Sequence, residues 1–203
     1  MDTDSDYFHI LSTLLEVHAY HFMPQANLHP EISKRNILRG YSTSQLLLKH
    51  AWKLHEDIQF LSYAPHFVSR AILTASCITV SVLLSHYMVG VPLQAKDEMM
   101  QSVTGAMRAC SIHDGDLLHR ATNMLESYWS ISRTGAPLEI PTRQISEFSH
   151  RLGTSLSFDC LRRWKRDVDA SRPAADAADK RPPLDGTPGT RSPFFRDTRA
   201  ALC

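Results

Sequence analysis

The sequence lacks closely spaced cysteines. Its four cysteines, Cys77, Cys110, Cys160 and Cys203, stand far apart, and no two of them form a C-x2-C pair. This spacing excludes the usual structural zinc site, which takes thiolates from paired positions. Isolated thiols in apolar helical segments behave as small hydrophobic residues, so we expect a reducing intracellular compartment. The acidic start of the chain also does not resemble a secretory signal.

Short motifs that carry chemistry are absent as well. The chain has no G-x-S-x-G elbow, no G-x-x-x-x-G-K-[S/T] loop, no G-x-G-x-x-G turn and no H-E-x-x-H pair. The best metal-ligand candidates are His18 with His21, which share a helix face, and the cluster His113, Asp114, Asp116 and His119. We interpret the first pair as helix-surface histidines and the carboxylates of the cluster as helix caps. We therefore predict no catalytic residue, no metal site and no cofactor.

Strand signals are equally scarce, whereas apolar residues recur at helical spacing along most of the chain. The stretch through Pro30 and Gly40 reads as a connection, because both residue types interrupt helices. After residue 168 the sequence turns to Ala, Asp, Pro and Arg without an apolar pattern. The sequence predicts an all-α fold with one irregular helical domain over 1–168 and a disordered tail over 169–203. The six expected helices lie near residues 6–23, 42–61, 66–89, 94–112, 117–134 and 145–167.

The third of these segments contains no formal charge between Arg70 and Lys96. Its apolar length is close to what a bilayer crossing needs, so a single membrane span at 71–91 is an alternative. Several Ser, Thr and His residues interrupt the run, and no cluster of Lys and Arg flanks it to set an orientation. We favour a buried core helix, which is also apolar on all sides.

Overall charge is nearly balanced, at +1, but it is unevenly distributed. Residues 161–203 hold ten Lys and Arg against six Asp and Glu. A basic run surrounds Trp164 and has two interpretations. It could be a nuclear-import or nucleic-acid patch. Alternatively, its cations complement the dipole of a helix C-terminus, and the tryptophan fills an apolar gap. The run consists of Arg162, Arg163, Lys165 and Arg166.

The most specific segment runs from Cys110 to Trp129. Gly115 permits a tight connection there, and Asp114 or Asp116 can cap the helix that follows. Downstream, apolar residues form a stripe on one face of that helix, which we expect to pack against other helices. The predicted stripe is Leu117, Ala121, Met124, Leu125 and Tyr128.

Residues 47–167 resemble the helical regulatory region of fungal zinc-cluster transcription factors. The resemblance is carried by four stretches of sequence: L-L-K-H-A-W-K-L-H-E-D, A-P-H-F-V-S-R-A-I-L-T-A-S, the segment from Cys110 to Trp129, and S-F-D-C-L-R-R-W-K-R-D. It combines a Pro-aromatic helix start, an acidic turn, an Arg-Ala helix and a closing aromatic pair. In this sequence those features are Pro65, Phe67, Asp114, Asp116, Arg120, Ala121, Tyr128 and Trp129.

The resemblance implies a transcription regulator, in the nucleus, of a metabolic or secondary-metabolite gene cluster. The six-cysteine module that binds zinc and reads DNA in that family is not matched in this sequence, so we expect a truncated regulator. It would act through protein partners or a full-length factor, as a homodimer or heterodimer, reaching DNA only indirectly. We expect no enzyme activity and no membrane association; the alternatives are the membrane anchor and a helical enzyme of an unrecognised kind.

Overall fold

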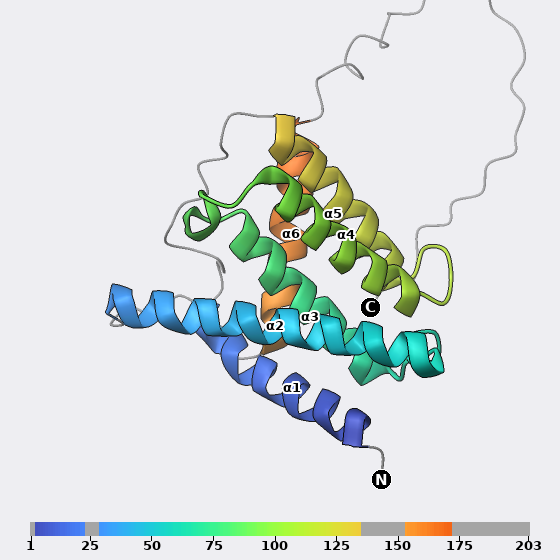
Figure 1. Cartoon of the computed structure of the whole chain (residues 1–203). Helices are drawn as coiled ribbons and strands as arrows, with labels where there is room; N and C mark the ends of the chain where they lie inside the picture. Colours follow the sequence, from blue (N-terminus) through green and yellow to red (C-terminus); the bar gives the residue numbers. More distant parts are fainter. Residues whose placement is uncertain (1–2, 23–28, 135–152, 172–203) are drawn as a thin grey trace, which may run out of the picture. The chain divides into compact units, whose positions relative to one another are not determined.

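A computed structural model describes residues 3–22, 29–134 and 153–171 of the chain. Within these ranges all regular structure is helical, so the predicted all-α fold is confirmed (Figure 1). Residues Met1–Ser171 form one compact unit, and the predicted tail from residue 172 onward lies outside the described residues. The elements are α1 (Thr3–Ala19), η1 (Tyr20–Phe22), α2 (Pro30–Ile58), α3 (His66–Leu83), η2 (His86–Met88), α4 (Leu93–Cys110), α5 (Leu117–Thr134) and α6 (Gly153–Ser171).

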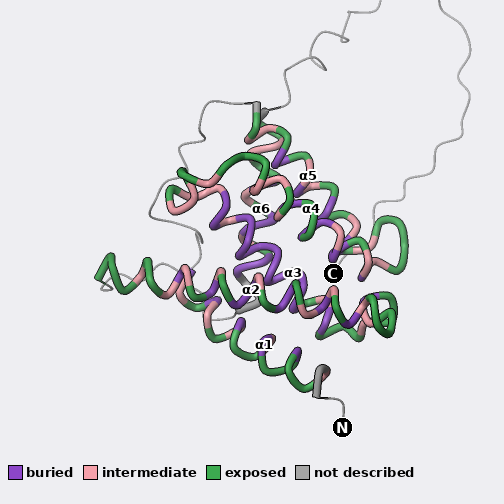
Figure 2. The backbone as a smooth tube through the Cα atoms, viewed as in Figure 1, coloured by how far each residue is buried: buried purple, intermediate pink, exposed green. Residues whose placement is uncertain are grey.

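Helix α3 forms the centre of this unit. Every residue from Ala71 to Val80 is buried, and α1, α2, α4 and α6 all contact the helix (Figure 2). Its polar side chains are hydrogen-bonded: Ser76 donates to the carbonyl of Ile72 at 2.7 Å, and Gln45 of α2 donates to Thr79 at 2.9 Å. By length and composition α3 is the one described helix that could cross a membrane, yet 72% of it is buried inside the unit.

Helices α1 and α2 form an antiparallel pair on one side of α3 (Figure 1). Near the start of α1, the rings of Tyr7 and His50 meet edge to face with centroids 5.0 Å apart. Beyond the end of α1, His21 lies within hydrogen-bond distance, 3.5 Å, of Asn36. The two helices therefore contact each other near both ends of α1.

Gly40 allows the two helices to approach closely. A Cβ atom at this position would lie 2.8 Å from the ring of Phe22 and 3.3 Å from the Cβ of His18. Phe22 is itself buried, so its ring has little room to move. Packing therefore requires a glycine at this position, although glycine lowers the intrinsic stability of a helix.

Helix α6 packs on the other side of α3 through a row of small polar side chains. Thr74 and Ser157 lie 3.2 Å apart, and Ser81 lies 3.5 Å from the thiol of Cys160. Cys77 completes the row: its thiol is 4.0 Å from the carbonyl of Ser157, and a hydrogen bond with Cys160, then burial, raises its pKa. The pair is thus a buried packing contact, consistent with the expectation of cysteines as small hydrophobic residues.

The predicted helix boundaries were wrong in three places. Helix α2 begins at Pro30, and Gly40 lies inside it, so the predicted connection there is wrong. Pro30 occupies the first helical position, where its missing N–H costs no hydrogen bond, and His29 caps the helix by accepting from the N–H of Glu31 at 3.4 Å. Ser44 is a mid-helix residue whose hydroxyl donates to the carbonyl of Gly40 at 2.8 Å.

The other two boundary errors concern α3 and α6. Helix α3 ends at Leu83, and the separate turn η2 follows it. Helix α6 continues past Asp167 to Ser171, so residues 169–171 of the predicted tail are helical. The predicted start of that helix, at residues 145–152, lies outside the described residues. In α5, the first buried position is Leu118 and not Leu117, which is exposed.

Replacing Gly40 tests the close approach of α1 and α2. We expect Gly40→Val to lower the free energy of unfolding by about 1–3 kcal/mol, because the added methyl groups overpack the contact with Phe22. Urea denaturation followed by circular dichroism measures the change. The matched control is Gly90→Val, since nothing lies within 4 Å of a Cβ atom there. Equal stability of the two variants would contradict the packing argument.

Candidate functional site

The predicted basic run forms a cationic face on α6. Arg162, Lys165 and Arg166 are exposed, and Arg163 is half-buried. At about 100° of helix rotation per residue, the four positions fall within an arc of roughly 160°. Helix α6 runs on to Ser171 and has no basic residue in its last turn, so these cations do not complement its C-terminal dipole as the second interpretation required. The four basic residues instead lie along the middle of the helix, and Asp159 and Asp169 fall within the same arc.

Trp164 anchors this face from the opposite side of α6. Its side chain is only 3% exposed and stacks on the ring of Tyr128 of α5, with centroids 5.7 Å apart and planes at 28°. The tryptophan therefore fills an apolar gap, as one interpretation predicted, and is not accessible for stacking on a nucleic-acid base. The first interpretation, an import or nucleic-acid patch, therefore rests on the basic side chains alone, because the tryptophan is buried.

Tyr128 ties the same contact to a charged residue. Burial, followed by the negative charge of Asp167, raises the pKa of Tyr128 to about 12, so the phenol stays protonated at any physiological pH. A hydrogen bond links the phenol to the Asp167 carboxylate. The acidic neighbour of the basic run is thus used to hold α5 against α6.

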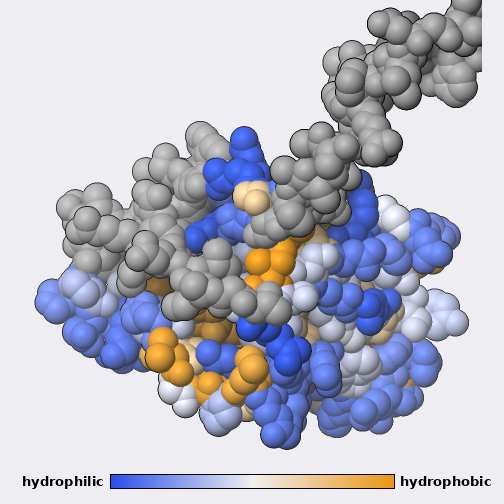
Figure 3. All heavy atoms as spheres, turned by 90° about the horizontal axis from the view of Figure 1, so that it is seen from above, coloured by the Kyte–Doolittle hydropathy of each residue, from blue (hydrophilic) through white to orange (hydrophobic). Residues whose placement is uncertain are grey.

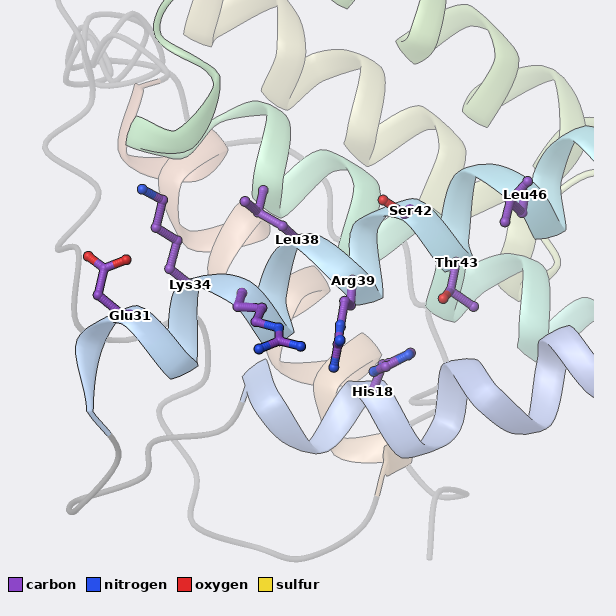
Figure 4. Close-up of a pocket in the computed structure, with 9 residues that line it drawn as sticks. His18, Glu31, Lys34, Leu38, Arg39, Ser42, Thr43 and Leu46 are labelled. Carbon is purple, nitrogen blue, oxygen red and sulfur yellow. The ribbon is translucent and has the colours of Figure 1, made fainter.

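A second cationic surface lies where α1 and α2 meet, and no sequence pattern indicated it. A cavity of about 550 Å³ opens between the end of α1 and the first half of α2 (Figure 4). Its rim carries three exposed cations, Lys34, Arg35 and Arg39, beside Glu31 and His18. Sequence reasoning missed it because residues 30–41 were interpreted as a connection. Leu38, Ser42, Thr43 and Leu46 complete the lining.

His18 is the titratable group on the α1 side of this cavity. Burial lowers its pKa, and the nearby His21 and Arg39 lower it further. Its Nδ1 atom is buried without a hydrogen-bond partner. The rings of His18 and His21 lie 6.1 Å apart, and the described residues contain no group of three or more His, Cys, Asp or Glu that could hold a metal ion. His18 therefore contributes an uncharged edge to a cationic groove.

Asp116 has a capping role within the His and Asp cluster. Its carboxylate accepts from the N–H of His119 at 2.7 Å, from the N–H of Ile112 at 2.9 Å and from the hydroxyl of Ser111 at 3.0 Å. Partial burial acts to raise its pKa, but these hydrogen bonds outweigh that effect and lower the pKa to about 2. Asp114 instead points into solvent, 3.7 Å from the His119 ring. The cluster fixes the α4–α5 turn around Gly115, whose φ is +89°.

No protein-family model, curated protein or solved structure matches the chain. The face shown in Figure 3 is mostly hydrophilic, with small separated apolar groups. Within residues 3–22, 29–134 and 153–171, the cationic face of α6 and the cationic groove of α1 and α2 are charged features that can recognise an acidic partner.

Removing the Asp116 carboxylate tests the cap. We expect Asp116→Ala to lower the free energy of unfolding by about 1–2 kcal/mol at pH 7, as loss of a helix cap does. The control is Asp114→Ala, whose side chain is fully exposed and should change stability little. A loss of the same size in both variants would mean that local charge, and not the cap, stabilises the turn.

The same pair of variants predicts a pH dependence. Because the folded-state pKa of Asp116 lies near 2, below the ordinary value of 3.8, its contribution is complete above about pH 5 and is lost as the pH falls toward 2. The difference in unfolding free energy between the native protein and Asp116→Ala should shrink across that interval. A difference that stays constant from pH 5 to about 2 would contradict the assigned hydrogen bonds.

Truncating Trp164 tests the attachment of α6. We expect Trp164→Ala to cost about 3–5 kcal/mol, because it removes a buried aromatic and its stack on Tyr128. Lys165→Ala, one residue away on the exposed side, should stay within about 0.5 kcal/mol of the native protein. Thermal and urea unfolding measure both, and a small effect at Trp164 would mean that α6 is held by other contacts.

Proposed function

We propose that the chain is the helical regulatory part of a zinc-cluster-type transcription regulator, active in the nucleus. It acts by binding proteins, among them a full-length factor that supplies DNA recognition, so that this chain reaches DNA only indirectly. The controlled genes would belong to a metabolic or secondary-metabolite cluster, as the family resemblance implies. No catalytic step is part of the proposal.

The observation that carries the proposal is the position of the residues that make the resemblance. Asp116 caps α5, Tyr128 stacks under the cationic face, and Trp129 is buried while its Nε1–H donates to Asp97 of α4 at 2.8 Å. Pro65 stands at the N-terminal cap of α3. Tyr128 and Trp129 hold α5 against α6 and α4, and Asp116 caps α5, so these residues have packing roles of the kind that the resemblance implies.

The cationic face of α6 supports a binding role. Its exposed arginines and lysine are presented by a helix that Trp164 holds in place, which is a rigid way to display positive charge. Such a face suits an acidic protein surface, including that of an import receptor. Burial of Trp164 makes single-stranded nucleic acid a poorer fit, because the aromatic platform is missing.

The membrane-anchor alternative rests on α3 alone. The helix is long and apolar enough for a span, but the buried core helix of a water-soluble protein has the same properties. The contacts of α3 with four other helices favour the core role. Expression in the soluble fraction without detergent separates the two, since an anchored protein would sediment with membranes.

A reporter assay tests the proposed regulation. The full chain is fused to a DNA-binding domain whose target sites precede a reporter gene in yeast. We expect the fusion to change reporter output severalfold relative to the DNA-binding domain alone. The double variant Arg162→Glu/Lys165→Glu should lose most of that change, because it reverses charge on the α6 face.

The control is Lys49→Glu/Lys53→Glu, which reverses two exposed cations of α2 outside that face and should keep the response. Fluorescent fusions of the same variants report nuclear accumulation in parallel. Reporter output equal to that of the DNA-binding domain alone, from a folded and expressed fusion, would sink the regulatory proposal. An equal loss of reporter output in both double variants would show that the α6 face has no specific part in the response.

A further inference from the structure

Helix α1 carries apolar side chains on two faces. One face is buried against the rest of the unit through Phe8, Leu11, Leu15 and Ala19. The other is an exposed stripe, defined here as Tyr7, Ile10, Leu14 and Val17, in which Ile10 is 61% and Val17 is 56% exposed. Figure 2 shows α1 at the edge of the unit with many exposed residues. Large apolar side chains exposed side by side on one helix are typical of an interaction surface.

The spacing of the stripe identifies the geometry of that helix. Steps of three, four and three residues are the seam pattern of helices that pack with side chains interlocked. The pattern is also symmetric about residue 12. In an antiparallel pair, Tyr7 of one copy would lie opposite Val17 of the other, and Ile10 opposite Leu14. A two-fold interface requires this kind of self-complementarity.

Charge is complementary in the same arrangement. The start of α1 is acidic. Asp6 is exposed, and Asp4 lies two residues before it in the sequence. The other end of α1 borders the cationic groove, whose rim holds Lys34, Arg35 and Arg39. An antiparallel pair places the acidic start of each copy beside the cationic groove of the other, whereas a parallel pair places like charges together.

We propose that the chain forms a two-fold symmetric homodimer through the exposed stripe of α1, with the two α1 helices antiparallel. The acidic start of each α1 lies against the groove between α1 and α2 of the other copy. Leu46, half-exposed on α2 and part of the groove lining, extends the apolar contact beyond the stripe. The dimer does not depend on the regulatory role proposed above, so either can fail without the other.

Sedimentation equilibrium of the full chain tests the association. We expect a mass of about twice the 22.9 kDa of one chain at micromolar concentration. Ile10→Lys should raise the dimer dissociation constant by at least about tenfold, because each seam then holds two desolvated ammonium groups. The control Ile58→Lys changes a similarly exposed isoleucine, 59% against 61%, at the end of α2 and should leave the mass unchanged. Circular dichroism verifies that both variants stay helical.

Disulfide cross-linking tests the orientation. In a Cys203→Ser background, a Tyr7→Cys protein and a Val17→Cys protein carrying tags of different size are mixed and oxidised with a disulfide reagent. The antiparallel dimer predicts cross-linked species that contain one chain of each kind, with little cross-linking of either protein alone. Strong cross-linking of Tyr7→Cys with itself would indicate a parallel pair and would overturn the proposed geometry.

A chain that sediments as a monomer up to about 100 μM would overturn the dimer, because a two-fold apolar seam of biological use should associate well below that concentration. So would a dimer that Ile10→Lys and Ile58→Lys weaken equally, since its interface would lie elsewhere. Binding of an unrelated protein to the stripe, with the free chain monomeric, would likewise count against self-association.

Discussion

Burial of α3 on all sides is the constraint on which the rest of the structure depends. A helix without charge from Ala71 to Val80 is stable in water only if other helices cover its whole circumference. Helices α1, α2, α4 and α6 provide that cover. Small and hydroxyl-bearing residues make the close approach feasible, because Thr74, Ser76 and Thr79 each have a hydrogen-bond partner inside the unit.

This requirement divides the covering helices into inner and outer faces. The inner face of α6 is fixed by Trp164 against Tyr128 and by the polar row against α3, which leaves its cations outward. The inner face of α1 is fixed by Phe8 and Leu15, which leaves a second apolar face largely exposed, although Tyr7 also contacts His50 of α2. The surfaces proposed here for binding are therefore the faces that packing on α3 does not use.

The sequence predicted the core better than the groove. The uncharged run of α3 and the turn at Gly115 are strong local signals, and both elements begin where they were expected, although α3 ends at Leu83 rather than at residue 89. Helix α2 was half missed, because Pro30 and Gly40 read as interruptions. In the structure, Pro30 starts the helix. Gly40 leaves room for the ring of Phe22, a residue that is distant in the sequence. No local pattern carries that information, so the cationic groove beside it could not be predicted.

The exposed stripe of α1 also could not be predicted from the sequence. Its residues have ordinary helical spacing, and only the structure shows that a different set of apolar side chains already fills the core. For α6, the sequence located the cations but not the helix end, since the residues after Asp167 lack the apolar periodicity that would extend the prediction.

Native-state hydrogen exchange of the full chain in detergent-free buffer tests the central role of α3 most directly. The structure predicts that the amides from Ala71 to Val80 are the slowest in the unit, exchanging only through global unfolding, and that the outer helices α1 and α6 open earlier. Exchange of the α3 amides as fast as those of α1, or a protein that needs detergent to stay in solution, would contradict this account.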